Sequence, residues 1–190
     1  ATRMGGGDKG LRVVAGRRLI DRVIDRLAPQ VGAMAINANG DPARFAEFGV
    51  PVLADPLPDH PGPLAGVLAG MDWAASLGAA QMVTAAADTP FFPCDLVVRL
   101  QASAGPSGLA LAATRDTGGR VRAQPTFGLW PVALRDDLRA ALEDGLRKIV
   151  IWTERHAAGL ALFEADGRDP FFNVNTQDDI AEAERVLGAR

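Results

Sequence analysis

Apolar residues early in the chain recur at helical spacing. Five of them fall on one face of a predicted helix, opposite Arg and Asp side chains: Leu19, Ile20, Val23, Ile24 and Leu27. Similar patterns predict helices over 42–48, 64–77, 93–103, 132–143 and 176–187. Short apolar runs predict strands over 31–37, 50–54, 81–87, 109–114, 126–130, 160–164 and 172–174. Segment 148–156 fits either state, because its β-branched and aromatic residues favour a strand whereas its charged flanks permit a helix.

Predicted strands and helices alternate over most of the length. This alternation indicates an α/β fold with a mostly parallel sheet and helices on both faces. In such sheets, ligands bind outside the carboxyl ends of the strands. Several predicted strands end in polar residues, namely Asn37, Asn39, Asp55, Asp88, Asn173 and Asn175. We therefore expect side chains that are far apart in the sequence to meet at one edge of the sheet.

Length, charge and cysteine content narrow the class of protein. The 190 residues suit one domain, 1–190, and a formal net charge of −3 argues against binding nucleic acid by its phosphates. One Cys cannot form an internal disulfide, and no apolar run approaches the roughly 18 residues of a membrane span. A strand normally leads into a Gly-rich turn such as 1–10. We therefore expect an upstream strand that the printed sequence lacks, although a chain that starts in a loop is the alternative.

The segment Arg3-Met4-Gly5-Gly6-Gly7-Asp8-Lys9-Gly10 has the residue types of a phosphate-binding loop. Glycines let backbone N–H groups approach anionic oxygens, because no Cβ stands in the way. Arg3 and Lys9 add two cations that suit a triphosphate, and Lys9 is one of only two Lys in the chain. The spacing is not the Walker pattern. A flexible loop with solvated charges is the alternative.

A carboxylate follows the strand predicted over 81–87. Asp88 stands before Thr89-Pro90, a position from which a carboxylate commonly presents oxygen to Mg²⁺. The alternative is an Asp that caps the next turn through its own backbone. A neighbouring triphosphate site would favour the metal.

All four Asn residues lie in two Asn-x-Asn pairs, Asn37/Asn39 and Asn173/Asn175. Residues i and i+2 of a strand face the same side, and Asn offers both a donor and an acceptor. These groups suit base edges, ribose hydroxyls and metal-bound waters, although Asn also favours turns.

A helix start and an acidic turn precede the helix predicted over 64–77. Gly62-Pro63 opens that helix, whose free N–H groups form an end that favours anions. Asp55, just before it, has the acceptor oxygens to bind a base or a ribose. Close packing at the helix start and simple turn formation are the alternatives.

Taken together, these segments resemble the molybdenum cofactor guanylyltransferase family, the MobA-type nucleotidyltransferases. The matching motifs occur in the family's order: Arg3-Met4-Gly5-Gly6 through Asp8-Lys9-Gly10, Ile36-Asn37-Ala38-Asn39, Asp55, Gly62-Pro63-Leu64-Ala65-Gly66, Asp88-Thr89-Pro90 and Asn173-Val174-Asn175-Thr176. The resemblance implies a Rossmann-like three-layer fold. It implies transfer of GMP from GTP to the phosphate of molybdopterin, with release of pyrophosphate and formation of the guanine dinucleotide cofactor.

The resemblance also implies roles for individual residues. The implied catalytic residues are Asp88, Lys9 and Arg3. The implied nucleotide-binding residues are Lys9, Asn37, Asp55, Gly62, Asp88 and Asn175, and Asn175 is also expected near the pterin product. Asp88 is the implied ligand of Mg²⁺, the one cofactor expected. The implied setting is cytoplasmic, with a pterin-supplying protein and molybdoenzyme apoproteins as partners and with no nucleic acid or membrane.

Two departures from the family pattern stand out. Members usually carry a strand ending in Leu-Ala-Gly-Gly before the Arg-Met-Gly loop, and Gln124-Pro125 stands here where a His-Pro pair is common. A hydrogen-bonding role stays open for Gln124. The alternatives to guanylyl transfer are a cytidylyl- or other nucleotidyltransferase of the same fold, and a non-catalytic carrier of a nucleotide or pterin.

Overall fold

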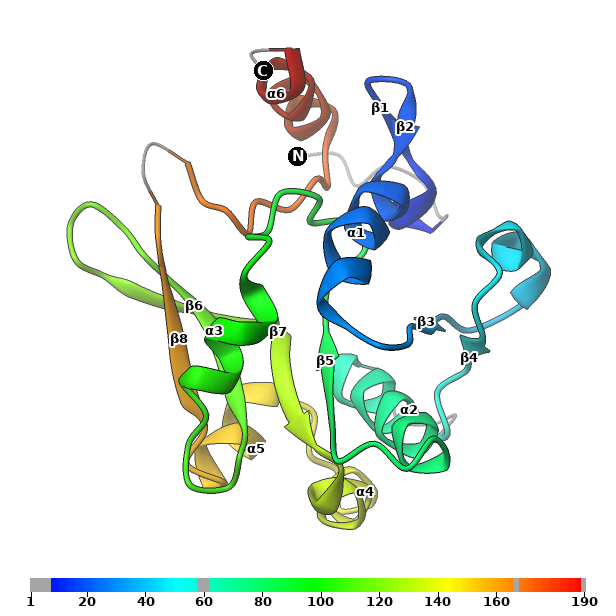
Figure 1. Ribbon diagram of the computed structural model, residues 1–190, viewed down its shortest axis with the longest axis vertical. Coiled ribbons are helices and arrows are strands. Elements are labelled where there is room, and N and C mark those ends of the chain that lie inside the picture. The colour runs from blue at the N-terminus through cyan, green and yellow to red at the C-terminus, as the bar shows by residue number, and fades with distance from the viewer. Residues whose placement is uncertain (1–7, 58–61, 166–167, 189–190) are drawn as a thin grey trace.

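The computed structural model describes residues 8–57, 62–165 and 168–188 (Figure 1). The strands are β1 (Val13–Val14), β2 (Arg17–Arg18), β3 (Ile36–Asn37), β4 (Val52–Leu53), β5 (Gln81–Thr84), β6 (Ala110–Arg115), β7 (Val121–Pro131) and β8 (Gly159–Glu164). The α-helices are α1 (Leu19–Leu27), α2 (Pro63–Ser76), α3 (Leu96–Ala102), α4 (Arg135–Glu143), α5 (Ile149–Arg155) and α6 (Gln177–Gly188). Short 3₁₀ helices are η1 (Lys9–Leu11), η2 (Ala28–Gln30), η3 (Pro42–Phe48) and η4 (Val132–Leu134).

Four strands form the main sheet, in the order β5–β7–β6–β8. β6 and β8 are parallel, whereas β7 runs antiparallel between β5 and β6. Three of the four strands therefore run in one direction, and β3 pairs with β4 in parallel as a separate sheet. The expected α/β architecture is confirmed. The reversed direction of β7 follows from the turn at 116–120, because so short a connection can join only antiparallel strands.

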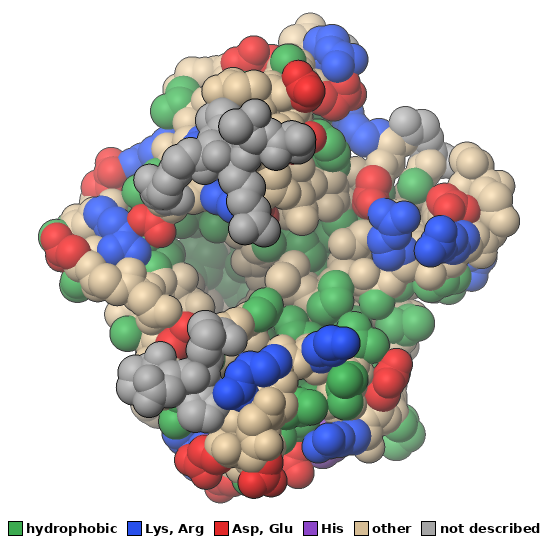
Figure 2. All heavy atoms as spheres, turned by 180° about the vertical axis from the view of Figure 1, so that it is seen from behind, with side chains coloured by type: hydrophobic (Ala, Val, Ile, Leu, Met, Phe, Trp, Pro, Cys, Tyr) green, Lys and Arg blue, Asp and Glu red, His purple; other side chains and the backbone are tan. Residues whose placement is uncertain are grey.

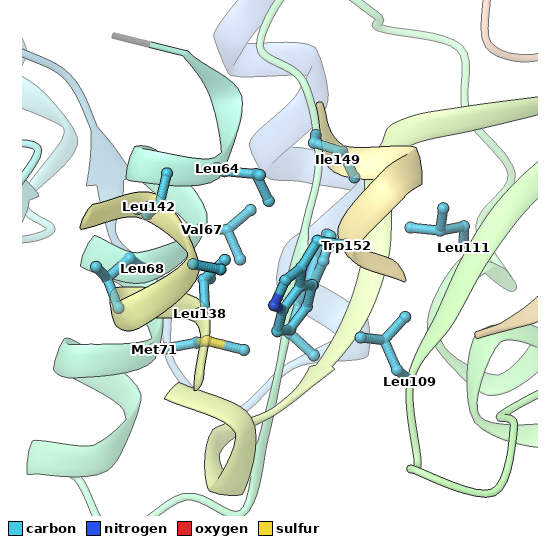
Figure 3. Close-up of a cluster of buried hydrophobic side chains, with 12 residues drawn as sticks. Leu64, Val67, Leu68, Met71, Leu109, Leu111, Leu138, Leu142, Ile149 and Trp152 are labelled. Carbon is cyan, nitrogen blue, oxygen red and sulfur yellow. The ribbon is translucent and has the colours of Figure 1, made fainter. Parts of the chain in front are cut away.

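Side chains that alternate along β6 place helices on both faces of the sheet. Leu109, which precedes the strand, and Leu111 pack with α2, α4 and α5 in one cluster (Figure 3). Ala110 and Ala112 pack on the opposite face with Leu96 and other residues around α3. This period of two gives the expected three layers and buries the centre of the sheet.

Segment 148–156, which fitted either state in the sequence, is the helix α5. Its buried residues Ile149 and Trp152 lie three positions apart, so they share the face that packs into the core. The Trp152 ring stacks against that of Trp130, with the ring centroids 6.2 Å apart. The Trp152 indole Nε1 donates to a carboxylate oxygen of Asp137 at 2.8 Å, which ties α5 to α4.

Three of the predicted strands, 31–37, 50–54 and 172–174, differ clearly from the structure. The run 31–37 contributes only Ile36–Asn37 as β3, and 50–54 contributes only Val52–Leu53 as β4, because these strands pair over two residues each. The run 172–174 is not a strand. Its backbone instead passes the loop after β5, where the N–H of Val174 donates to the carbonyl of Asp88 at 2.9 Å.

An apolar cavity of about 700 Å³ opens between the β3–β4 pair and β5. Side chains of α1, α2, β3 and β5 contribute to its lining, among them Ile24, Val67, Ile36 and Met82. A space-filling view of the rear face shows a hollow with hydrophobic side chains at its depth (Figure 2). Among the described residues, no helix combines the length and the apolar character needed to cross a bilayer.

The link between α4 and α5 gives a stability prediction. Asp137→Ala should lower the free energy of unfolding at pH 7 by about 1 kcal/mol, because it leaves the buried Trp152 N–H without its acceptor. The value is modest because the Asp137 side chain is 57% exposed, so water reaches the gap. Asp136→Ala, at the exposed neighbour, is the matched control and should change stability by less than about 0.5 kcal/mol. Denaturant unfolding measures both.

The same variant has an expected pH dependence. Burial raises the pKa of Asp137, but hydrogen bonds from His156 and Trp152 outweigh it and hold that pKa below its usual value of 3.8. Because the pKa is lower in the folded state, the carboxylate adds stability at pH values above its unfolded-state pKa. This stability is lost as the pH falls through the folded-state pKa. The difference between the two variants should therefore shrink below about pH 3.8. Equal stability of the two variants at pH 7 would contradict the assignment.

Candidate functional site

Three side chains from distant parts of the sequence meet at one edge of the structure. The Lys9 Nζ donates to the Asn175 Oδ1 at 2.6 Å and lies 3.9 Å from the Asp88 Oδ2. The Lys9 side chain is 54% exposed and that of Asp88 is 18% exposed. The ammonium therefore faces solvent, whereas the carboxylate beside it is sheltered. These three residues are called the Lys9 cluster below. The sequence predicted their convergence, and the structure brings them together.

The loop after β5 and the segment before α6 hold each other in place. The buried hydroxyl of Thr89 donates to the side-chain oxygen of Asn173. The guanidinium of Arg12 donates to the backbone carbonyl of Asn175 at 3.0 Å. With the Val174–Asp88 backbone bond, these contacts fix the backbone on both sides of the Lys9 cluster. Sequence reasoning missed Arg12 and Thr89 as parts of the site, although Thr89 lies within the Asp-Thr-Pro motif.

The start of α6 orients Asn175. The Asp179 carboxylate accepts from the backbone N–H groups of Asn175 at 2.9 Å and Thr176 at 2.8 Å. The Thr176 hydroxyl accepts in return from the Asp179 N–H at 3.2 Å, as the predicted N-cap. Burial raises the pKa of Asp179, but these backbone hydrogen bonds outweigh it and hold that pKa below 3.8. A carboxylate that stays ionised keeps the segment before α6 in one position.

A second group of polar side chains lies after β3 and β4. The Asn37 Nδ2 donates to one Asp55 oxygen at 3.0 Å, and the Asn39 Nδ2 donates to the other at 2.8 Å. The backbone N–H of Asp55 donates back to the Asn39 Oδ1 at 2.8 Å. These three residues are called the Asp55 cluster. The two amides hold the carboxylate in a fixed orientation, and each of its oxygens keeps a further lone pair for a ligand.

The first turn of α2 lies against the Asp55 cluster. A Cβ added to Gly66 would lie 2.2 Å from the Asn37 Oδ1, so only glycine leaves room for that amide. Gly62 is the residue before α2 and has a φ of +141°, which favours glycine. The predicted position of Gly62 at the helix start is therefore confirmed, and the helix N-terminus is brought towards Asn37 through Gly66.

Arg3 and Gln124 complete the set of residues that the sequence singled out. Arg3 lies outside the described residues. The Gln124 Nε2 donates to the Thr114 hydroxyl at 3.0 Å, and Thr114 donates to the Asp169 carboxylate at 3.1 Å. The hydrogen-bonding role left open for Gln124 thus has a partner within the sheet.

Metal-binding capacity at this edge is limited to isolated carboxylates. Among residues 8–57, 62–165 and 168–188, no group of three or more His, Cys, Asp or Glu side chains could hold a metal ion. A cation at Asp88 would therefore need oxygens from a ligand. This is the usual situation for Mg²⁺, which binds through one or two carboxylates plus substrate phosphates.

The fold and this edge define an α/β protein of the nucleotidyltransferase type. The family model described as "MobA-like NTP transferase domain" matches residues 1–158. The chain belongs to this family.

Relatives agree with the family assignment. The molybdenum cofactor guanylyltransferase of Rhodopseudomonas palustris (strain BisB5) is 52% identical over 189 residues, covering 98% of this chain and 89% of the relative. The protein of the same name from Bradyrhizobium sp. (strain ORS 278) is 52% identical over 191 residues, covering 98% and 88%.

Solved structures show the same fold at low sequence identity. Molybdopterin-guanine dinucleotide biosynthesis protein A from Archaeoglobus fulgidus has a TM-score of 0.70 at 21% identity, over 97% of this chain and 93% of that one. The 2-C-methyl-D-erythritol 4-phosphate cytidylyltransferase from Thermus thermophilus has a TM-score of 0.68 at 18% identity, over 98% and 100%. The expected Rossmann-like fold is confirmed.

The contact between α2 and Asn37 gives a prediction for the site. Gly66→Ala should displace the Asn37 side chain from Asp55, because the added Cβ would overlap its amide oxygen. The side-chain NH₂ signals of Asn37 in an ¹⁵N NMR spectrum should shift, and the spectrum is simple because the chain has only four Asn and five Gln side-chain amides.

The matched control is Gly70→Ala, one turn further along α2. Its Cβ would meet the Met82 sulfur at 2.7 Å, and that flexible side chain also lines the cavity, so it can move aside. The Asn37 signals should keep their positions in this variant. Unchanged Asn37 signals in Gly66→Ala would show that the helix does not constrain the cluster.

Proposed function

We propose that this protein transfers GMP from GTP to the terminal phosphate of molybdopterin, which releases pyrophosphate and forms a guanine dinucleotide cofactor. Two relatives that are 52% identical over nearly the whole chain carry the name molybdenum cofactor guanylyltransferase. The observation that carries the proposal is the Lys9 cluster, in which an ammonium, a carboxylate and an amide meet at one edge of an NTP transferase fold.

Lys9 would bind the phosphates that leave as pyrophosphate. Its ammonium is held by the Asn175 amide oxygen and by the nearby Asp88 carboxylate, so it is already pointed at this edge before a nucleotide arrives. Transfers of phosphoryl and nucleotidyl groups depend mainly on positioning and on neutralising charge. An ammonium that is held in place both positions the phosphates and neutralises their charge.

Asp88 has the chemistry to hold Mg²⁺. Its carboxylate is 18% exposed and follows β5, so it offers a hard oxygen ligand at the edge where the phosphates would lie. When bound there, Mg²⁺ would neutralise charge on the phosphate oxygens as a Lewis acid. The carbonyl of Asp88 is held by Val174, which keeps the carboxylate beside Asn175.

The Asp55 cluster would recognise the base or the ribose. Asn37 and Asn39 orient the Asp55 carboxylate and leave it acceptor capacity on both oxygens. Guanine presents two adjacent N–H donors on its pairing edge, whereas cytosine presents a single amino donor beside a ring acceptor. A carboxylate therefore suits guanine better than cytosine.

The reaction needs no strong general base from the protein. The attacking group is a phosphate of the pterin, which is already ionised at neutral pH, and it would displace pyrophosphate in line at the α-phosphorus of GTP. Among the residues that the structure describes, the His is His156. It lies at the contact between α4 and α5 and not at the Lys9 cluster. We propose a cytoplasmic setting, where GTP is available, with a pterin-supplying protein and molybdoenzyme apoproteins as partners.

Removing either charged member of the Lys9 cluster tests the proposed reaction. Asp88→Ala and Lys9→Ala should each slow pyrophosphate release from GTP and molybdopterin by roughly 10²–10³, because each removes a group that stabilises charge in the transition state. Asp95→Ala and Lys148→Ala are controls with the same change in charge elsewhere, and their rates should stay near that of the parent.

Thermal unfolding of all four variants separates a lost activity from a lost fold. Guanylyl transfer at the parent rate by Asp88→Ala would reject the role of that carboxylate. Nucleotide binding by the parent protein without pyrophosphate release would favour a non-catalytic carrier.

Base preference gives a separate prediction for Asp55. Calorimetry should show tighter binding of Mg–GTP than of Mg–CTP to the parent protein. Asp55→Asn should weaken GTP binding by about 1–3 kcal/mol, since an acceptor pair for the base is lost, and should change CTP binding less. Equal loss for both nucleotides would assign Asp55 to the ribose, and a preference for CTP in the parent protein would favour cytidylyl transfer.

A further inference from the structure

One arginine outside both clusters lies between them. Arg44, in η3, donates through Nε and one terminal nitrogen to the Asp8 carboxylate. The same terminal nitrogen donates to the backbone carbonyl of Asn39, and the other donates to the carbonyl of Asp41 at 2.7 Å. The side chain is only 29% exposed, and its guanidinium lies 4.9 Å from the centre of the Phe45 ring.

The turn before η3 is shaped to admit this guanidinium. Gly40 has a φ of +84°, a conformation that L side chains rarely adopt. A Cβ on Gly40 would also lie 3.1 Å from a terminal nitrogen of Arg44. The carbonyls of Asn39 and Asp41, on either side of Gly40, both point at the same side chain. The turn is therefore held open around Arg44.

Arg44 is connected to the Lys9 cluster through Asp8 and contacts the Asp55 cluster at the backbone of Asn39. Asp8 directly precedes Lys9, whose ammonium belongs to the Lys9 cluster. The Asn39 side chain donates to the Asp55 carboxylate and accepts from the Asp55 backbone N–H, both at 2.8 Å. A planar guanidinium has five donors in a fixed fork, so it can join these two segments rigidly, which the single point charge of a lysine cannot do.

We propose that Arg44 is a positioning residue that sets the separation between Lys9 and the Asn39–Asp55 pair, so that both ends of one nucleotide bind at once. This inference rests on the proposed function, because it treats the Lys9 cluster as the phosphate end and the Asp55 cluster as the base end. Two linked contacts reinforce each other only when their spacing matches the ligand. The Arg44 side chain would not contact the nucleotide, and its bond to the Asp55 cluster goes to the backbone carbonyl of Asn39.

The test compares a ligand that needs both ends with one that needs only the phosphate end. In Arg44→Gln, the KM for GTP should rise about 10-fold or more while kcat stays within about 3-fold, since binding shared by ground and transition states is lost. Inhibition by inorganic tripolyphosphate, which has no base, should change by less than about 2-fold. Arg115→Gln removes a guanidinium that pairs with Glu164 at the edge of the sheet, and it should leave both values unchanged.

Amide hydrogen exchange tests whether Arg44 joins the two segments, and it needs no enzymatic activity. The N–H groups of Leu11, Arg12 and Ala38 are hydrogen-bonded in the structure and report on the two segments that Arg44 joins. Their exchange should quicken by about 10-fold in Arg44→Gln relative to Arg115→Gln, because local opening becomes easier.

The outcomes separate this inference from the proposed function. Absence of pyrophosphate release by the parent protein would reject the proposed function. Hydrogen exchange would still show whether Arg44 joins the two segments. Equal increases in the KM for GTP and the inhibition constant for tripolyphosphate would overturn the inference, because Arg44 would then act on the phosphate end alone. Unchanged exchange at Ala38 would overturn it as well.

Discussion

The site depends on the hydrogen bonds that attach the segment before α6 to the loop after β5. Val174 binds the backbone of Asp88, and Thr89 binds the Asn173 side chain. Together with the Lys9 bridge and the Arg12 bond to the Asn175 carbonyl, these contacts hold Asn175 near Asp88, although the two residues are far apart in the sequence. Because these bonds are made by backbone groups and a buried hydroxyl, the Lys9 ammonium and the Asp88 carboxylate stay available to a ligand. One set of groups therefore holds the loops together, and the Lys9 and Asp88 side chains are left for the proposed chemistry.

The layers beneath the site explain why these loops can be held so closely. Leucine and tryptophan side chains fill one face of the main sheet, while alanines on the other face let α3 approach. The central strand β6 is thus buried on both faces and provides a rigid base, whereas β5, which leads to Asp88, is half-buried beside the cavity. The Asp55 cluster rests on the separate β3–β4 pair, so its placement relative to the Lys9 cluster needs a further connection. Arg44 supplies one through Asp8 and the turn at Gly40.

Local sequence patterns predicted most of the helices and the ends of the strands. The spacing of Leu19, Val23 and Leu27 was enough for α1, and Thr176 marked the start of α6 because its capping contacts lie within four residues. The pairing of β7 was not predicted, since apolar alternation carries no information on strand direction. Asp88 was found because an Asp-Thr-Pro turn follows a predicted strand, Lys9 because it lies in a Gly-rich segment, and Asn175 because all four Asn lie in two Asn-x-Asn pairs. The bonds from Arg44 to Asp8 and from Thr89 to Asn173 join positions 36 and 84 apart, so no local pattern could reveal them.

The central claim is that Lys9, Asp88 and Asn175 act together on one magnesium–triphosphate. A crystal structure with Mg²⁺ and a non-hydrolysable GTP analogue tests it most directly. The account predicts the triphosphate against the Lys9 ammonium, with the metal about 2.1 Å from an Asp88 oxygen and from phosphate oxygens. A nucleotide bound elsewhere, or a metal held without Asp88, would contradict it.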